Sequence, residues 1–358
     1  MPTPLRIGLI GAGRMGRSHA IAIAANPGAE LVAIADPVDT TLAAETGARL
    51  HDSHAALLEH GGVDAVIIAN PNDQHVPTTL DVLSAGVPAL LEKPVGIDIA
   101  EVRRLADAVD RSGVPVLVGH HRRHHPLIQQ AHHAIGSGSL GRVVAITALW
   151  LTRKQDEYFD GWRRRPGAGV LLINLVHDLD VLRHLCGEIT AIQAVTSNAV
   201  RGFEVEDTAG LLLEFESGAI GTLTGSDAVT APWGWDQNAG DDPQFAEQPD
   251  QPSYFIAGTH GSLTVPKLQR WTYPGQADWR APLTSDYLTR PRGGSLQNQL
   301  QHFIGVARHQ EAPIVSVADA GRSLAAVEAA QSAARTRTRA TPQSIAVSHA
   351  ADTDRILA

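Results

Sequence analysis

The first 120 residues alternate short apolar runs with segments of helical periodicity. Five runs of strand length, rich in Val, Ile and Leu, cover residues 5–10, 30–35, 64–69, 87–92 and 114–119. Helix-like segments lie between and after them, near 14–25, 38–46, 53–60, 73–85 and 98–111. Right-handed strand, helix, strand connections place successive strands in one parallel sheet with helices on both faces. The alternation therefore predicts a doubly wound α/β domain over residues 1–122.

The pattern changes near residue 123, where strands begin to follow one another with few helices between them. Strand-like segments cover residues 142–151, 190–200, 207–218, 219–229, 253–265 and 268–273. Helical segments are expected near 126–135, 169–185, 295–309 and 317–338. This order predicts an α+β domain over residues 123–338 with an open, mainly antiparallel sheet. The last helices could pack back on the first domain, and we expect residues 339–358 to be a disordered tail or to reach a neighbouring subunit.

Composition narrows the class of partner. A chain of 358 residues exceeds the size of one usual core, and its net charge of −9 does not favour a nucleic-acid partner. Cys186 is the only cysteine, so an internal disulfide is impossible and a cytoplasmic location is expected. No signal peptide precedes the first strand, and no run approaches the roughly 20 apolar residues of a membrane helix. A small-molecule substrate fits best.

The chain has 17 histidines, some of them in the run HHRRHH at 120–125. Adjacent histidines point in diverging directions, the neighbouring arginines repel cations, and the spacing is not that of a metal motif. We therefore expect no metal there, and interpret the run as a polar segment near the domain junction.

The sequence IGLIGAGRMGRSHA contains Gly11, Gly13 and Gly16 in the spacing G-x-G-x-x-G, after a strand and at the start of a helix. In that context Gly11 permits a tight turn, Gly13 lets the main chain approach a pyrophosphate, and Gly16 lets helix and strand pack closely. Free N–H groups at the helix start, around Met15, bind phosphate oxygens. The motif predicts a dinucleotide site.

The second strand ends at Asp36, 20 residues after Gly16. A carboxylate at that place accepts hydrogen bonds from the adenosine ribose and repels a 2′-phosphate, so NAD is favoured over NADP. Arg14 lies in the glycine loop and could partly offset this repulsion.

Two further segments follow strands of the predicted parallel sheet, at the carboxyl ends where such sheets bind ligands. The segment LLEKPVG places Glu92 and Lys93 after the strand at 87–92. An ammonium aimed at the nicotinamide end can hydrogen-bond a substrate hydroxyl and stabilise alkoxide character. The segment IANPNDQHVP supplies further candidate cofactor contacts, namely Asn70, Pro71, Asn72 and His75.

The stretch VLLINLVHDLDVL, residues 170–182, has the apolar content of a buried helix but is interrupted by polar residues. His177 has the side chain best suited to proton transfer near neutral pH, because the ordinary pKa of histidine is about 6.5. Asn174 and Asp180 each lie three residues from His177, a spacing that keeps side chains on one face of an α-helix. Asp178 is expected on another face.

These motifs resemble the glucose-fructose oxidoreductase, inositol dehydrogenase and rhizopine-catabolism (Gfo/Idh/MocA) family over nearly the whole chain. The matching segments are GAGRMG, NPNDQH, EKP, GAGVLLINLVHDLDVL and EDTAGLLLEFESGAIGTL. The resemblance implies a nicotinamide-binding Rossmann domain, followed by an α+β domain whose open sheet mediates a homodimer or homotetramer. It also implies that Lys93 and His177 act on a hydroxyl or keto group beside the nicotinamide.

One position departs from the family pattern. Inositol-dehydrogenase-like members keep an aspartate four residues before the histidine, whereas this chain has Ile173. Asn174 is the nearest polar replacement but cannot supply a negative charge, and Asp180 could supply one if its side chain turns the same way. We therefore expect one of these two residues to assist His177.

The sequence thus predicts an NAD-dependent oxidoreductase that transfers a hydride between the nicotinamide and a secondary hydroxyl or keto carbon of a sugar, cyclitol, sugar acid or cyclic diol. His177 would take the hydroxyl proton while Lys93 polarises the same oxygen. Candidate substrate-binding residues, besides His177 and Asn174, are Arg123, Trp162 and Arg163.

Two other functions are compatible with the motifs. One is a redox-neutral glycosidase that retains NAD and oxidises a ring carbon transiently. The other is an NAD-binding regulator without catalysis, which need not keep Lys93 and His177 together.

Overall fold

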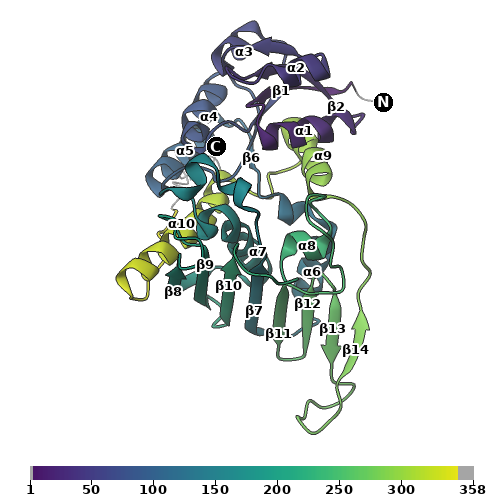
Figure 1. Ribbon diagram of the computed structural model, residues 1–358. Helices are drawn as coiled ribbons and strands as arrows, with labels where there is room; N and C mark the ends of the chain where they lie inside the picture. The colour runs from purple at the N-terminus through teal and green to yellow at the C-terminus, as the bar shows by residue number, and fades with distance from the viewer. Residues whose placement is uncertain (1–2, 346–358) are drawn as a thin grey trace, which may run out of the picture. The chain divides into compact units, whose positions relative to one another are not determined.

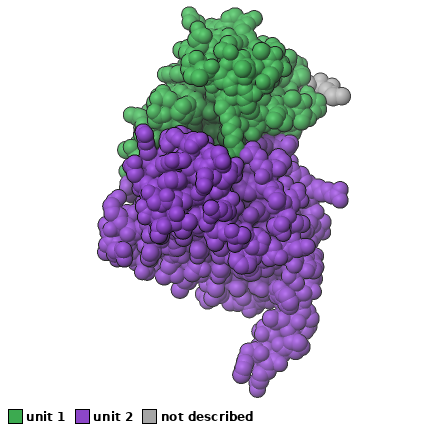
Figure 2. Space-filling view, viewed as in Figure 1, with its two compact units in different colours: residues 1–119, 300–322, 344–358 green, residues 120–299, 323–343 purple. Residues whose placement is uncertain are grey.

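The computed structural model describes residues 3–345, which form two compact units. Of the described residues, unit 1 comprises 3–119, 300–322 and 344–345, and unit 2 comprises 120–299 and 323–343 (Figure 2). The expectation for the tail falls mostly on residues 346–358, which lie outside the described residues.

Unit 1 contains a six-stranded sheet in the order β3-β2-β1-β4-β5-β6, in which every neighbouring pair is parallel. The strands are β1 (Leu5–Ile10), β2 (Ala29–Ala35), β3 (Arg49–His51), β4 (Ala65–Ile68), β5 (Ala89–Leu91) and β6 (Val116–Val118). The order reverses between β1 and β4, which gives the two halves of a doubly wound sheet. The predicted α/β class is confirmed.

The helices of the first 119 residues also follow the predicted segments. They are α1 (Arg14–Ala24), α2 (Thr41–Thr46), α3 (His54–His60), α4 (His75–Ser84), preceded by a 3₁₀ turn at Asn72–Gln74, and α5 (Ile99–Ser112). The sequence did not indicate β3, because its three residues, Arg-Leu-His, form no apolar run and lie at the sheet edge.

Unit 2 is built on an eight-stranded sheet in the order β14-β13-β12-β11-β7-β10-β9-β8. The strands are β7 (Val143–Leu151), β8 (Ile189–Ser197), β9 (Thr208–Phe215), β10 (Ile220–Ser226), β11 (Tyr254–Gly258), β12 (Gly261–Val265), β13 (Gln269–Thr272) and β14 (Thr284–Tyr287). All neighbouring pairs are antiparallel except β7 and β10. The mainly antiparallel sheet is confirmed, and the segment expected as one strand at 253–265 is a pair of strands.

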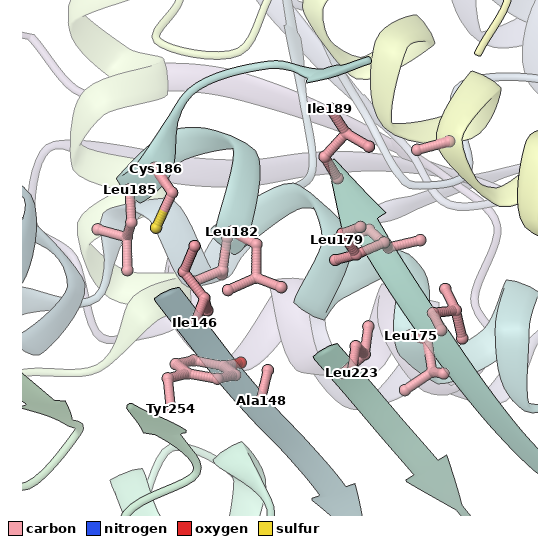
Figure 3. Packing of buried hydrophobic residues seen from close by; sticks show 14 of the residues in the cluster. Ile146, Ala148, Leu175, Leu179, Leu182, Leu185, Cys186, Ile189, Leu223 and Tyr254 are labelled. Carbon is pink, nitrogen blue, oxygen red and sulfur yellow. The ribbon is translucent and has the colours of Figure 1, made fainter. Parts of the chain in front are cut away.

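The remaining helices are α6 (Pro126–Gly136), α7 (Val176–Cys186), α8 (Trp235–Ala239), α9 (Ser295–Ala307) and α10 (Val317–Thr336). α7 follows β7 in the chain and lies over one face of the sheet, as Figure 1 shows. Figure 3 shows Leu179 and Leu182 of α7, together with Leu175 just before it, facing Ile146 of β7 and Leu223 of β10. Cys186, at the end of α7, is buried in the same cluster.

The strands of this sheet alternate buried and exposed residues, so one face packs under the helices and the other faces outward. Gly225 of β10 allows the close approach of α7, because a Cβ atom there would collide with the side chain of Leu175. The sheet therefore fixes the position of the helix that carries His177.

Among residues 3–345, no group of three or more His, Cys, Asp or Glu side chains is arranged to hold a metal ion. In the same part of the chain, no helix is both long enough and apolar enough to cross a membrane.

Candidate functional site

The glycine loop of unit 1 has the close main-chain contacts that its motif predicts. Gly11 has a φ of +100°, and a Cβ atom there would lie 2.5 Å from the carbonyl oxygen of Ala69. A Cβ atom on Gly16 would collide with the carbonyl oxygen of Gly11. Gly13 caps the N-terminus of α1, and a Cβ atom there would have no neighbour within 4 Å. The loop therefore has open space only at the position where a pyrophosphate is expected.

Asp36 follows β2 and lies beside this loop. Its Oδ2 accepts a 2.7 Å hydrogen bond from the N–H of Ala12, and its Oδ1 accepts from Val38 and Asp39 at 2.8 and 2.9 Å. These bonds fix the carboxylate next to the glycine turn, and Oδ2, which accepts only one of them, can accept a further hydrogen bond. Arg14 and Met15 occupy the first two positions of α1, with Arg14 exposed.

The segment after β4 connects to the segment after β5 through His75. This buried side chain places Nδ1 2.7 Å from the carbonyl oxygen of Pro94 and Nε2 3.0 Å from that of Asn70. Burial lowers the pKa of His75, so the ring is neutral at pH 7 and one nitrogen donates at a time. The geometry gives His75 a role in holding the two loops, while Pro71 is exposed and Asn72 is half-buried.

Asn70 offers an acceptor at this edge of the sheet. Its Nδ2 donates a 2.8 Å hydrogen bond to Thr78, while its Oδ1 is buried and has no hydrogen-bond partner among the described residues. A buried acceptor without a partner is unfavourable, and a ligand that donates to it removes the penalty.

Glu92 anchors the EKP turn to α1. Its Oε1 lies 2.8 Å from Nε2 of His19, and its Oε2 accepts a hydrogen bond from the main-chain N–H of Lys93 at 3.1 Å. Glu92 and His19 are both buried, whereas Lys93 is half-buried. Glu92 therefore fixes the main chain from which Lys93 projects.

In unit 2, the helix of His177 begins with a π-helical turn, Leu171–Leu175, in place of the α-helical turn expected there. π-helical turns recur at functional sites because they change which side chains line a helix face. Gly169 precedes the turn with a φ of +93°, and a Cβ atom there would collide with the Glu206 carboxylate. That carboxylate accepts a 3.0 Å hydrogen bond from the N–H of Leu171, so it caps the turn.

His177 lies in the first turn of α7 and is buried. Its ring contacts the ring of His121 edge to face, with centroids 5.1 Å apart, and that of His120 at 6.3 Å. The histidine run at 120–125, expected as a polar segment, is mostly buried and includes a 3₁₀ turn at His121–His124. This turn therefore packs beside the proposed base.

Asp180 is hydrogen-bonded to Arg123, which the sequence indicated as a candidate substrate-binding residue. Arg123 donates two hydrogen bonds to its carboxylate, at 2.8 and 2.7 Å, and Ser323 donates a third at 2.8 Å. Burial alone would raise the pKa of Asp180, but His120 and Arg123 outweigh it and hold the pKa below its usual range. The negative charge of Asp180 is thus neutralised by Arg123.

Asp178 is fully buried on another face of α7. Its Oδ1 accepts a 2.7 Å hydrogen bond from the Tyr254 hydroxyl and lies 3.2 Å from Arg122. Arg122 also pairs with Asp236, which accepts a hydrogen bond from Trp150. Burial raises the pKa of Asp178 to about 6 despite Arg122 and Tyr254.

Asn174, in the π-helical turn, contacts a lysine that the sequence analysis did not single out. The ammonium of Lys154 donates a 2.9 Å hydrogen bond to its Oδ1. The same ammonium lies 4.1 Å from the ring centroid of Tyr158 and 5.3 Å from that of Trp150. Asn174 therefore directs its oxygen towards a positive charge.

Trp162 and Arg163 lie in a 3₁₀ turn, Gly161–Arg164, after the segment of Tyr158. The guanidinium carbon of Arg163 is 4.7 Å from the Tyr158 ring centroid and 5.1 Å from the Trp162 ring centroid. Arg164 donates a hydrogen bond to the carbonyl oxygen of Phe159 and so stabilises its own loop. Arg163 is the arginine of this turn that joins the group around Asn174.

Comparison with known proteins agrees with these arrangements. Residues 5–120 match the family model described as an oxidoreductase family with an NAD-binding Rossmann fold, and residues 128–264 match the GFO/IDH/MocA C-terminal domain. The chain belongs to the Gfo/Idh/MocA family. It is an oxidoreductase of the dehydrogenase class that acts on CH–OH groups, and NAD is the cofactor of its Rossmann unit.

Relatives cover most of the chain. Rhizopine catabolism protein MocA of Rhizobium meliloti is 33% identical over 62% of this chain and 71% of its own length. The scyllo-inositol 2-dehydrogenase (NAD(+)) of Bacillus subtilis is 28% identical over 89% of this chain and 91% of its own. The WlbA dehydrogenase of Bordetella pertussis, solved with NADH and UDP-GlcNAcA, is 27% identical with a TM-score of 0.76, covering 94% of this chain and 98% of its own.

The residues of unit 1 fit this cofactor. Gly13 leaves open space at the start of α1, Asp36 is fixed beside the glycine turn, and Asn70 presents an acceptor without a protein partner in the described chain. NAD, when bound, supplies the atom that accepts the hydride.

Proposed function

We propose that this protein oxidises a secondary hydroxyl, or reduces the corresponding ketone, of a sugar, cyclitol, sugar acid or cyclic diol. The observation that carries the proposal is the presence of Lys93 on a turn anchored by Glu92, together with His177 in the first turn of a buried helix. An ammonium and an imidazole are the pair required to polarise a hydroxyl oxygen and to take its proton.

We propose His177 as the base and Lys93 as the group that hydrogen-bonds the same substrate oxygen. His177 is buried and its ring packs edge to face against His121, which limits the orientations of the ring. A base held in a fixed orientation near its substrate speeds proton transfer through its position as well as through its pKa. Lys93 is half-buried, so it remains accessible to a small molecule.

We propose that Asn174, and not Asp180, is the nearer polar assistant on the helix of His177. The carboxylate of Asp180 already accepts three hydrogen bonds, two of them from Arg123. Arg123 and Asp180 therefore support the position of α7, while Asn174 remains half-buried and able to contact substrate.

For the cofactor, we propose NAD in preference to NADP. Asp36 accepts from the Ala12 N–H, which places its negative charge beside the glycine turn, and a 2′-phosphate would be repelled there.

The proposed activity is tested by a screen of polyols, sugars, sugar acids and dihydrodiols with NAD and NADP, following absorbance of the reduced cofactor. We expect NAD reduction with at least one class, and we expect His177→Ala and Lys93→Met each to lower kcat about 10³-fold. His133→Ala, a change at an exposed histidine of α6, is the matched control and should retain full activity. Near-normal kcat in His177→Ala would contradict the assignment of the base.

For quaternary structure, we propose a homodimer or homotetramer formed through the outward face of the eight-stranded sheet. Val195 of β8 and Ile220 of β10 are 62% and 56% exposed on this face, next to Leu212 of β9. A sheet face with exposed apolar side chains often forms the interface between subunits. Sedimentation of Val195→Glu with Ile220→Glu should show smaller particles than the wild type, whereas Ile97→Glu, at an exposed site of unit 1, should change nothing.

A further inference from the structure

Three side chains gather beside Asn174 and are not required for hydride transfer itself: Lys154, Tyr158 and Arg163. We propose that Lys154 and Arg163 bind a carboxylate of the substrate, so that the protein acts on a polyhydroxy acid such as an aldonate or a uronate. The inference rests on the proposed function, because it takes the substrate to lie next to Asn174 and His177.

The main chain that follows β7 fixes the position of Lys154. Its main-chain N–H donates to the carbonyl oxygen of Asp227 at 2.9 Å, and its own carbonyl oxygen accepts from Arg201 at 2.9 Å. With both main-chain groups bonded, the side chain projects from a fixed point. The residue is 8% exposed, and its ammonium reaches Asn174, three residues before His177. Lys154 is thus directed towards Asn174 and not into solvent.

Arg163 brings a second positive charge to the same aromatic ring. Its guanidinium carbon lies 4.7 Å from the Tyr158 ring centroid, and the Lys154 ammonium lies 4.1 Å from it. An anion that approaches this ring is therefore attracted by two positive charges. The Nε atom of Arg163 is buried and has no hydrogen-bond partner among the described residues. A buried donor of this kind is favourable only when a ligand supplies its acceptor.

Two nearby carboxylates are bound by Arg201. Asp227 is buried, and its Oδ1 accepts a 2.8 Å hydrogen bond from Nε of Arg201. Burial raises the pKa of Asp227, although Arg201 and Lys154 act in the opposite direction. Asp156 also pairs with Arg201, at 3.2 Å, and is largely exposed. Arg201 is therefore the cation that both of these carboxylates contact.

The shape of the group favours a carboxylate on a hydroxylated carbon chain. A guanidinium matches the two oxygens of a carboxylate, and an ammonium adds a point charge with three donors. The Oδ1 atom of Asn174 accepts from Lys154, so its amide N–H groups are left to donate to a substrate oxygen.

The test compares matched substrates that differ by one carboxylate. We measure kcat/KM for D-gluconate against D-glucitol and for D-galacturonate against D-galactose, at saturating NAD. The variants are Lys154→Met and Arg163→Gln, with Lys154→Arg as the charge-retaining variant. Arg165→Gln, at an exposed arginine of the same loop, is the matched control. Thermal unfolding of each variant identifies any that fail to fold.

We expect the wild type to prefer the acid of at least one pair by about 10-fold or more. The acid-to-neutral ratio of kcat/KM should fall about 10- to 100-fold in Lys154→Met, in line with the loss of one charge-assisted hydrogen bond. It should fall about 10-fold in Arg163→Gln, recover partly in Lys154→Arg, and stay within about twofold in Arg165→Gln.

An unchanged ratio in Lys154→Met, or a preference for neutral substrates, overturns the inference while the proposed dehydrogenase function stands. A preference for glucose 6-phosphate over the acids also overturns it. If no probe is oxidised, calorimetry measures binding of the acids in the presence of NADH. Absence of binding at millimolar concentration then overturns the inference. Retained activity in His177→Ala, with the acid preference intact, would instead remove the proposed base and leave this inference.

Discussion

In unit 1, the residues that fit a dinucleotide are arranged by main-chain contacts: Gly11 approaches Ala69, Gly16 approaches Gly11, and Asp36 accepts from main-chain N–H groups. In unit 2, the helix of His177 is held by buried charged side chains, each bonded to a partner far away in the sequence. In unit 1, an added side-chain atom on Gly11 or Gly16 would collide with the main chain. In unit 2, loss of one partner would leave a buried charged group unpaired. Substitutions in the two regions should therefore fail in different ways.

The largest effect is expected where a buried ion pair of unit 2 is broken. Arg123→Met leaves Asp180 buried without its bidentate partner, and we expect the free energy of unfolding to fall by about 3 to 5 kcal/mol. Urea unfolding measures this, with Arg165→Met as the exposed control. The double variant Arg123→Met with Asp180→Leu should recover part of the loss. A raised KM with unchanged stability would show instead that Arg123 serves the substrate.

A second effect in unit 2 depends on pH. Burial raises the pKa of Asp178 to about 6, above the 3.8 of an ordinary aspartate, so the folded state binds more protons between these values. The stability contributed by Asp178 is present below about pH 4 and is lost as the pH rises through 6. As the pH rises from 4 to 7, the free energy of unfolding of the wild type should fall by up to about 3 kcal/mol relative to that of Asp178→Asn.

Urea titrations of both proteins at pH 4, 5, 6 and 7 measure this difference, and the subtraction cancels other titrating groups. A difference independent of pH would mean that Arg122 and Tyr254 keep Asp178 ionised throughout.

In unit 1 the matched pair is Gly16→Ala and Gly13→Ala. The added methyl of Gly16→Ala collides with the carbonyl of Gly11, so we expect a loss of about 1 to 3 kcal/mol in stability. Gly13 has a φ of −66° and open space around it, so Gly13→Ala should fold normally. Its NADH affinity, measured by fluorescence titration, should nevertheless fall about 10-fold. Equal stability losses in the two variants would contradict the distinction.

The smallest effect concerns the choice of cofactor. Asp36→Asn keeps an acceptor for the Ala12 N–H and removes the charge, so the ratio of kcat/KM for NAD over NADP should fall about 10-fold. Asp39→Asn, a change at the neighbouring acidic residue, is the control for a general change of charge. An unchanged ratio in Asp36→Asn would assign the cofactor preference to other residues.

The same difference explains how much the sequence could predict. The glycine loop, Asp36 and the EKP turn are local, so spacing relative to predicted strands was enough to identify them. The contact of Asp178 with Tyr254 joins residues 76 positions apart, and no pattern within α7 indicates it. Lys154 was missed because a single lysine after a strand has no signature until the fold brings it to Asn174.

Local structure was predictable where apolar periodicity is strong. The strands of the parallel sheet other than β3, and the helices α1 to α5, follow their patterns closely. The π-helical turn at Leu171–Leu175 differs from an α-helix in its hydrogen bonds but hardly in its apolar content, so the sequence pattern did not indicate it. Spacing rules for an α-helix therefore overestimate how closely the side chains of Asn174 and His177 share one helix face.

The burial of Cys186 has a practical use. It is the only cysteine, it is 8% exposed, and burial raises the pKa of its thiol to about 12. Maleimides and iodoacetamides attack thiolates, so the native chain should resist these reagents at neutral pH. A cysteine introduced at an exposed site, such as Trp279→Cys, would then react selectively. The wild-type sequence thus already provides the unreactive background that fluorescent or spin labelling requires.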